Sequence, residues 1–115
     1  MILAWEQLQI YIKPGITDMR KQINSLAVLT QNELKLDPLS GNLFVFCNRN
    51  RKILKILYWD HNGFCMWLKR LEKDKFPWPN NQQEALEITR DELKMILDGI
   101  DFFKAHKKLN YSEVF

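Results

Sequence analysis

The stretch that decides the fold is LFVFC-NRNR-KILKILYWD-HNG-FCMWLKRL, residues 43–71. It contains three runs rich in β-branched and aromatic residues, 43–47, 52–59 and 64–71, separated by two short turns. Asn62-Gly63 in the second turn favours a tight hairpin, because both residues accept positive φ values. Strands joined by such short turns pair antiparallel, so this stretch predicts a three-stranded meander.

Alternate residues of these strands form two faces, and both faces are apolar. The first face holds Phe44, Phe46, Ile53, Leu57, Trp59, Phe64, Met66 and Leu68. The second face holds Leu43, Val45, Cys47, Leu54, Ile56, Tyr58, Cys65 and Trp67. A sheet with one wet face would alternate apolar with polar residues. We therefore expect a helix on one face, and the C-terminal helix or a second copy of the chain on the other.

Three charged residues interrupt these apolar faces. Lys55 and Arg70 fall on the first face, and Lys69 falls on the second. We expect their long stems to carry the charges to water at the sheet ends, or to a partner.

The residues before the meander predict a strand and a helix. Leu8–Ile12 alternates polar with apolar residues, which is typical of a strand. Apolar residues at three- and four-residue spacing between Met19 and Leu34 predict a helix. Thr17 or Asp18 is the expected N-cap of that helix, which should end before Asp37-Pro38.

The residues after the meander predict a short strand and a second helix. Residues 85–88 are strand-like, and Thr89-Arg90-Asp91-Glu92 is a capping box for a helix that ends near Gly99. We expect one compact α+β domain over residues 1–103, with an antiparallel sheet of four to five strands packed with two main helices. Residues 104–115 are expected to form a polar C-terminal tail.

Length and composition exclude several classes of protein. The chain has 115 residues, of which 46% are hydrophobic and 27% charged, so one folded domain is expected. No apolar run approaches the roughly 18–20 residues that a membrane span needs, and no secretory signal is visible. Cys47 and Cys65 lie at different heights on their predicted strands, so we expect two free, buried thiols in a reducing cytoplasm.

The sequence contains no motif for covalent, metal or cofactor chemistry. Its four glycines are isolated, so it lacks a glycine-rich phosphate loop. Acidic residues that could form a nuclease-type trio, such as Asp18 and Asp60, are better explained by helix caps and turns. The sequence therefore predicts no catalytic, metal-binding or cofactor-binding residue, no small-molecule substrate and no enzymatic activity.

The net charge of +3 is unevenly distributed along the chain. Residues 1–48 sum to zero and residues 76–115 sum to −2, whereas residues 49–75 sum to +5. Eight cations make this central excess: Arg49, Arg51, Lys52, Lys55, Lys69, Arg70, Lys73 and Lys75. Basic residues among aromatic ones suggest a polyanion partner, and lysines that guard a sheet edge against aggregation are the alternative.

Four blocks of residues stand out by their order along the chain: 37–46 (DPLSGNLFVF), 55–60 (KILYWD), 67–72 (WLKRLE) and 76–79 (FPWP). In this order they resemble the accessory (TnpB or Orf2-like) proteins of the IS sixty-six family of bacterial insertion sequences, which are unrelated to the RNA-guided nuclease also called TnpB. The resemblance spans about residues 8–103. It implies a role in transposition beside a separate DDE-type transposase that holds the catalytic carboxylates.

Two functions follow as expectations. The first is DNA binding, at the element ends, by the eight central cations, with Trp59 or Trp78 available to stack on an unpaired base. The second is a protein-interaction adaptor that docks on the cognate transposase, or self-associates as a homodimer, without DNA contact. Its rigid aromatic segment would be Phe76, Pro77, Trp78 and Pro79. Core and turn packing is the structural alternative for both the tryptophans and the prolines.

Overall fold

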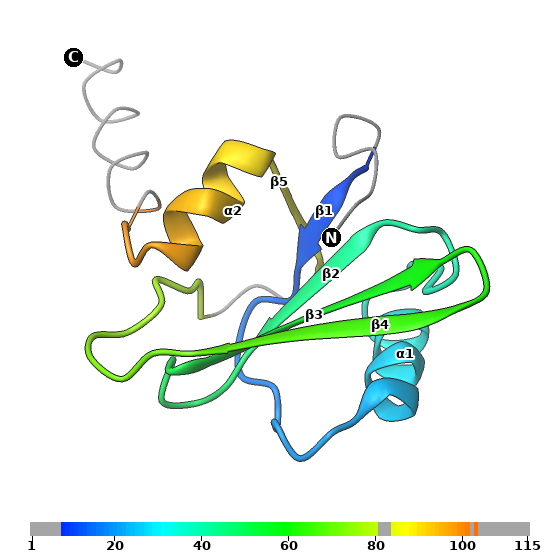
Figure 1. Cartoon of the computed structure of the whole chain (residues 1–115), viewed down its shortest axis with the longest axis horizontal. Coiled ribbons are helices and arrows are strands. Elements are labelled where there is room, and N and C mark those ends of the chain that lie inside the picture. The colour runs from blue at the N-terminus through cyan, green and yellow to red at the C-terminus, as the bar shows by residue number, and fades with distance from the viewer. Residues whose placement is uncertain (1–7, 81–83, 102, 104–115) are drawn as a thin grey trace.

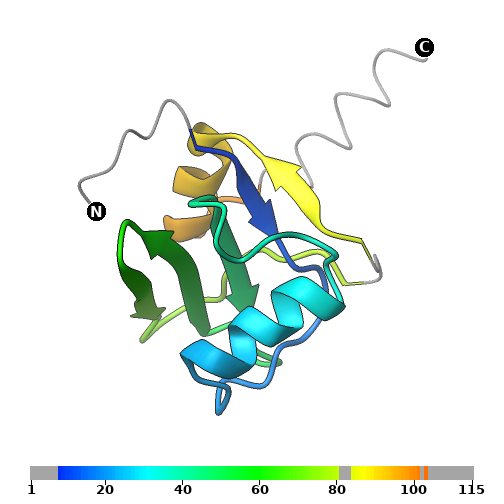
Figure 2. The same cartoon turned by 90° about the vertical axis from the view of Figure 1, so that its right-hand side faces the viewer.

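The computed structural model describes residues 8–80, 84–101 and 103. They form β1 (Ile10–Ile12), α1 (Ile23–Asn32), β2 (Leu43–Cys47), β3 (Ile53–Asp60), β4 (Gly63–Arg70), β5 (Leu86–Ile88) and α2 (Arg90–Leu97). The strands make one sheet in the order β4-β3-β2-β1-β5, and the two helices cover its opposite faces (Figures 1 and 2). The predicted α+β fold is confirmed, and the expected tail at 104–115 lies outside the described residues.

The meander pairs in the register that strand parity predicts. Phe44 lies opposite Leu57, and Tyr58 lies opposite Cys65. The hairpin turn is displaced by one residue from the expected Asn-Gly pair. Asp60 pairs with Gly63, so His61 and Asn62 form the loop and His61 takes the positive φ of 55°.

The sheet is mixed, where the sequence led us to expect an antiparallel one. β1 runs parallel to β2, and β5 runs antiparallel to β1. The parallel pair follows from the connection, because the chain leaves β1, passes through α1 across one face and returns in the same direction.

α1 begins four residues later than the apolar pattern suggests. Its N-cap is Gln22, so the expected caps Thr17 and Asp18 are wrong. The Thr17 backbone N–H instead donates to the Cys47 carbonyl oxygen at 2.9 Å, which holds this segment beside β2. The Asp18 carboxylate accepts from the Arg20 backbone N–H at 2.9 Å and closes a separate turn.

The face under α1 contains a buried lysine. Phe44, Phe46 and Leu57 pack against the helix, and Lys55 lies among them, only 3% exposed. Its ammonium group donates to the carbonyl oxygens of Met19 at 2.8 Å and Lys21 at 2.9 Å. Lys55 therefore ties the segment before α1 to the sheet, and its charge reaches neither water nor an external partner.

The opposite face is covered by α2 together with Phe76 and Trp78. The predicted capping box is confirmed, since the Thr89 hydroxyl accepts from the Glu92 backbone N–H and the Glu92 carboxylate accepts from the Thr89 N–H. Gly99, at a φ of 80°, terminates the helix as expected. The Lys69 ammonium donates to the Leu97 carbonyl oxygen at 2.9 Å, where a cation also complements the negative end of the helix.

Both cysteines are free, as expected. Cys47 is fully buried in central strand β2, and burial raises the pKa of its thiol to about 12. Cys65 is only half-buried because β4 is an edge strand, so the prediction of burial holds for Cys47 alone. In the described part of the chain, neither helix has the length and apolar character that a membrane span requires.

Replacing Lys55 by Met should destabilise the fold. Met keeps an unbranched apolar stem, but it leaves the Met19 and Lys21 carbonyl oxygens without their donor. We expect the free energy of unfolding to fall by about 2 kcal/mol, measured by urea denaturation. Arg49→Met, at an exposed turn position, is the control and should change stability by no more than about 0.5 kcal/mol. A K55M protein more stable than the parent would mean that desolvation of the ammonium outweighs its hydrogen bonds.

Candidate nucleic-acid interface

One end of the sheet is built from three segments that are distant in sequence, residues 13–20, 48–52 and 71–80. The Leu71 N–H donates to the Lys52 carbonyl oxygen at 2.8 Å, and the Phe76 N–H donates to the Arg51 carbonyl oxygen at 2.7 Å. The Gly15 N–H donates to the Pro79 carbonyl oxygen at 2.8 Å. The segment after β4 therefore runs beside the β2–β3 turn, at the left-hand end of the sheet in Figure 1.

The β2–β3 turn is held rigid by its first residue. The Asn48 side-chain oxygen accepts from the backbone N–H groups of Lys52 at 3.0 Å and Ile53 at 3.1 Å. Arg51 adopts a φ of 60°, which closes the loop. Arg49 and Asn50, the two residues that follow Asn48, are exposed at the tip of the turn. The turn therefore presents the Arg49 guanidinium from a backbone that these hydrogen bonds hold in place.

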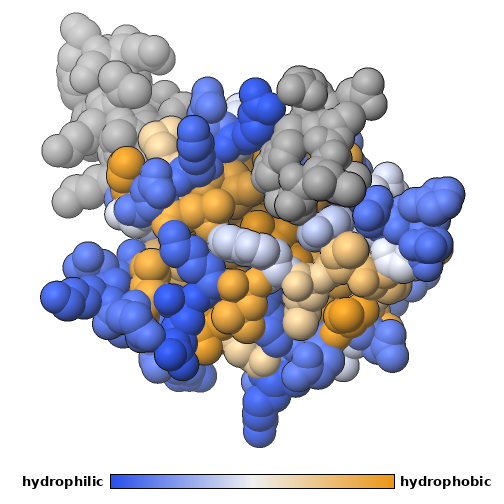
Figure 3. Space-filling model, viewed as in Figure 1, coloured by the Kyte–Doolittle hydropathy of each residue, from blue (hydrophilic) through white to orange (hydrophobic). Residues whose placement is uncertain are grey.

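Three of the eight predicted cations are exposed and have no partner among the described residues: Arg49, Lys73 and Lys75. All three lie on the basic end of the sheet, the name used below for the surface of residues 49–52 and 70–75. Figure 3 shows strongly hydrophilic side chains around this end of the molecule. These are the predicted cations that remain available to a polyanion.

Three more cations lie at the same end but already hold a hydrogen bond. Arg51 donates to the Asn80 side-chain oxygen, Lys52 to the Asp74 carbonyl oxygen at 3.1 Å, and Arg70 to the Glu72 carboxylate at 2.9 Å. The Arg70–Glu72 pair is exposed, with side-chain exposed fractions of 65% and 74%. Such a pair contributes little and exchanges readily with another anion.

The remaining two predicted cations have structural roles. Lys55 is buried under α1 and Lys69 binds the C-terminal end of α2. Both must be removed from the predicted nucleic-acid surface, because their ammonium groups already donate to backbone carbonyls inside the domain.

The predicted partner-binding segment is part of the core. Phe76, Pro77 and Trp78 are buried and Pro79 is half-buried. The Trp78 indole N–H donates to the carbonyl oxygens of Lys13 at 3.0 Å and Gly15 at 3.1 Å. These side chains close the end of the second face, so they offer neither the expected docking surface nor a platform for base stacking.

Trp59 does not belong to the basic end either. It lies near the other end of β3 and packs edge-on against Phe64, with ring centroids 5.1 Å apart. Six residues of the extended strand β3 lie between Trp59 and the β2–β3 turn, so the two are roughly 20 Å apart.

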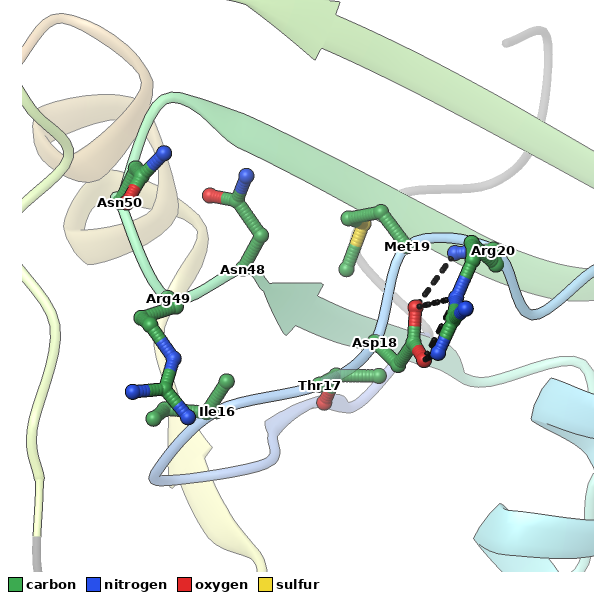
Figure 4. Close-up of a pocket in the computed structure, with 8 residues that line it drawn as sticks. All are labelled: Ile16, Thr17, Asp18, Met19, Arg20, Asn48, Arg49 and Asn50. Carbon is green, nitrogen blue, oxygen red and sulfur yellow. Dashed lines mark hydrogen bonds and ion pairs between the residues drawn. The ribbon is translucent and has the colours of Figure 1, made fainter.

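A cavity of about 570 Å³ opens between the segment before α1 and the β2–β3 turn (Figure 4). Its lining residues come from these two segments: Ile16, Thr17, Asp18, Met19, Arg20, Asn48, Arg49 and Asn50. Sequence reasoning identified only Arg49 as a site residue here. The alternating Asn48-Arg49-Asn50-Arg51 pattern was a local signal, but nothing in the sequence places it beside residues 16–20.

The cavity has one carboxylate, and it is already paired. Arg20 donates to both oxygens of Asp18, at 3.0 Å and 3.1 Å through Nε and at 2.6 Å through a terminal nitrogen. These hydrogen bonds hold the pKa of the Asp18 carboxyl down at about 2. No set of three His, Cys, Asp or Glu side chains in the described residues could hold a metal ion.

Comparison with known proteins identifies relatives across nearly the whole chain. The family model described as IS66 Orf2 like protein matches residues 8–107. The uncharacterized protein y4hO of Sinorhizobium fredii is 40% identical over 102 residues, which is 89% of each chain. The uncharacterized protein y4jC of the same organism is 31% identical over 101 residues, 88% of this chain and 86% of its own. No solved structure matches the chain significantly.

The pKa of Asp18 provides a direct check of the Asp18–Arg20 pair that lines one side of the cavity. We expect the side-chain carboxyl ¹³C signal of Asp18 to titrate with a midpoint of about 2. Because the folded pKa is lowered, any stability from the pair exists above the unfolded pKa and is lost as pH falls through about 2. Arg20→Gln should move the midpoint up toward 3.8, and Lys21→Gln, which removes a lesser influence, should move it less. An unchanged midpoint in R20Q would contradict the arrangement.

Proposed function

Because the chain belongs to the IS66 Orf2-like family, we propose that it assists transposition of an insertion sequence by binding DNA through the basic end of the sheet. The family description supports the insertion-sequence context. The DNA contact and the site are our proposal. The chain would act as a non-catalytic accessory protein, with strand transfer carried out by a separate transposase.

The observation that carries the proposal is the convergence of two basic segments. The β2–β3 turn and the segment after β4 are joined by backbone hydrogen bonds, and together they expose Arg49, Lys73 and Lys75 without described partners. Each cation that meets a phosphate releases condensed counterions, which is the main source of affinity for duplex DNA. Three such cations on a fixed backbone make a local positive surface despite the small net charge.

Two further cations can add to this surface. Arg51 and Lys52 are held by single hydrogen bonds to Asn80 and Asp74, within the same end of the sheet. Phosphate contacts of this kind position a protein on DNA but carry no base sequence. The proposal is therefore one of binding to the DNA backbone, with sequence selection left to other components.

The buried Cys47 thiol has its pKa raised to about 12 by burial, so it stays protonated and unreactive at neutral pH.

A second candidate function is docking on the transposase, and the exposed edge of the sheet favours it. β4 is an edge strand of eight residues. Its Trp67 and Leu68 are 39% and 52% exposed, and hydrophobic surface is visible near the centre of the face in Figure 3. A long apolar edge without proline is a ready template for an added strand. We propose an extended segment of the transposase as its occupant.

DNA binding should depend steeply on salt and on the two free lysines after β4. We expect Lys73→Gln together with Lys75→Gln to weaken binding to duplex DNA and to reduce the slope of log K against log salt by about 2. The measurement is fluorescence anisotropy with a duplex from the element end, between 50 and 200 mM salt. The expected change is about 2 because each lost lysine–phosphate contact reduces the slope by about one unit.

The matched control for this charge change is Lys35→Gln together with Lys94→Gln. Both lysines are exposed and lie outside the basic end, because Lys35 follows α1 and Lys94 lies on α2. The control has the same net charge as the test variant and should bind like the parent. Equal losses in the two variants would point to non-specific attraction, and no binding at 50 mM salt would refute the proposal.

Docking on the transposase should depend on the β4 edge and survive removal of nucleic acid. We expect Leu68→Lys to abolish co-purification with the cognate transposase after nuclease treatment, because a charge at the edge opposes strand addition. Val28→Lys, at an equally exposed position on α1, should leave it unchanged. If nuclease treatment by itself dissociates the parent protein from the transposase, direct docking is rejected. If the protein instead forms a concentration-dependent dimer and does not bind the transposase, the β4 edge is assigned to a second copy of the chain.

A further inference from the structure

The free edge of β4 presents one set of backbone groups, and a hydrogen bond on its other side identifies them. The Leu71 N–H, one residue beyond the strand, donates to the Lys52 carbonyl oxygen at 2.8 Å, so it points toward β3. Successive residues of an antiparallel strand direct their backbone groups to alternate sides, so the odd-numbered residues of β4 face β3. On the other side β4 has no neighbour among the described strands (Figure 1). The N–H and C=O groups that face this free edge are those of Phe64, Met66, Leu68 and Arg70.

The two helices leave two apolar side chains exposed at this edge. Leu68 lies on the first face and Trp67 on the second, and both are exposed. Because the two residues are consecutive in an extended strand, they lie at nearly the same height on opposite faces. A strand added beside β4 would cover both of them, since its own side chains also point alternately to the two faces.

Arg70 places a positive charge next to these apolar side chains. It lies on the same face as Leu68, two residues further along the strand. The Arg70 guanidinium donates from a terminal nitrogen to the exposed Glu72 carboxylate at 2.9 Å. A guanidinium has five N–H donors, and an exposed pair of this kind contributes little stability. Arg70 can therefore bind a further carboxylate, beside Glu72 or in its place.

We propose that the free edge of β4 binds an extended acidic–apolar segment, with a carboxylate opposite Arg70 and apolar side chains opposite Leu68 and Trp67. The inference rests on the second candidate function for the source of the segment, the transposase, but not for its chemistry. In the antiparallel direction, which is slightly more stable per residue than the parallel one, the segment reads acidic, any residue, apolar, apolar. Its second position lies opposite Lys69, whose ammonium group already donates to the Leu97 carbonyl oxygen, so that position needs no particular side chain.

The charges along this edge favour an acidic segment over a second copy of the chain. Arg70 is followed, just past the strand, by the exposed Lys73 and Lys75, so this end of the edge attracts acidic side chains and repels basic ones. Residues 63–70 themselves contain no Asp or Glu. The same strand of a second copy would therefore bring no carboxylate to Arg70, whereas a segment of a different protein can supply one.

Amide hydrogen exchange on the full chain gives strand addition a specific readout. The probes are overlapping peptides that tile the cognate transposase, and a synthetic peptide that repeats the acidic–any–apolar–apolar pattern. A peptide that adds to the edge should slow exchange of the Phe64, Met66, Leu68 and Arg70 N–H groups, while the odd-numbered N–H groups are already protected by β3. Slowed exchange only at other positions would overturn the proposal. Protection of the four groups that rises with protein concentration, without peptide, would assign the edge to a second copy and also overturn it.

Variants of the charged pair test the carboxylate at Arg70. We expect Arg70→Gln to weaken peptide binding about tenfold, because it removes a hydrogen bond between charged groups. Glu72→Gln should strengthen binding about twofold, because it removes the carboxylate that competes for Arg70. Lys35→Gln and Glu33→Gln make the same charge changes at exposed positions after α1 and should leave the affinity unchanged. Equal losses in R70Q and K35Q would indicate diffuse attraction and overturn the proposal.

The outcomes separate this inference from the proposed functions. A transposase complex that is lost in Leu68→Lys but unchanged in Arg70→Gln would keep docking at the edge and reject the acidic segment. If the transposase does not bind at all, docking is refuted, and the synthetic peptide then decides the chemistry of the edge. Protection of the four edge N–H groups by that peptide would support the inference, and no protection would overturn it. DNA binding is measured separately, and its failure would refute only the DNA-binding function.

Discussion

The whole structure depends on a sheet that is apolar on both faces. β2 and the first half of β3 expose almost none of their side chains, so neither face can be left to water. α1 covers one face, and α2 with Phe76 and Trp78 covers the other. Burial of each large apolar side chain contributes about 2 kcal/mol, which makes this two-sided burial the main stabilising term of a 115-residue chain.

Two lysines are integrated into these apolar layers. Lys55 lies in one and holds the backbone before α1, while Lys69 lies beside the other and holds the end of α2. Each ammonium group donates to the backbone of a covering segment, Lys55 to two carbonyl oxygens and Lys69 to one, and so links that segment to the sheet. Two of the three charges that interrupt the apolar pattern, Lys55 and Lys69, are therefore tethers, whereas Arg70 stays exposed beside Glu72.

The same burial determines where function can reside. The segment after β4 must cross the end of the sheet to insert Phe76 and Trp78, and in doing so it lies beside the β2–β3 turn. Core packing therefore brings the exposed Lys73 and Lys75 close to the segment that carries Arg49. The aromatic residues that suggested a partner surface are the anchor, and the charged residues just before them, 72–75, remain at the surface.

The sequence by itself determined the three-stranded meander, its register and its two apolar faces, because alternation along a strand is a local property. It also determined the capping box of α2 and the free state of both cysteines. It did not determine that β1 runs parallel to β2, that α1 begins at Ile23, or which cations are free. Those outcomes depend on contacts between distant segments, such as Lys55 with Met19 and Thr17 with Cys47. The cavity beside Arg49 is likewise a product of tertiary structure alone, since its two walls are about thirty residues apart in the chain.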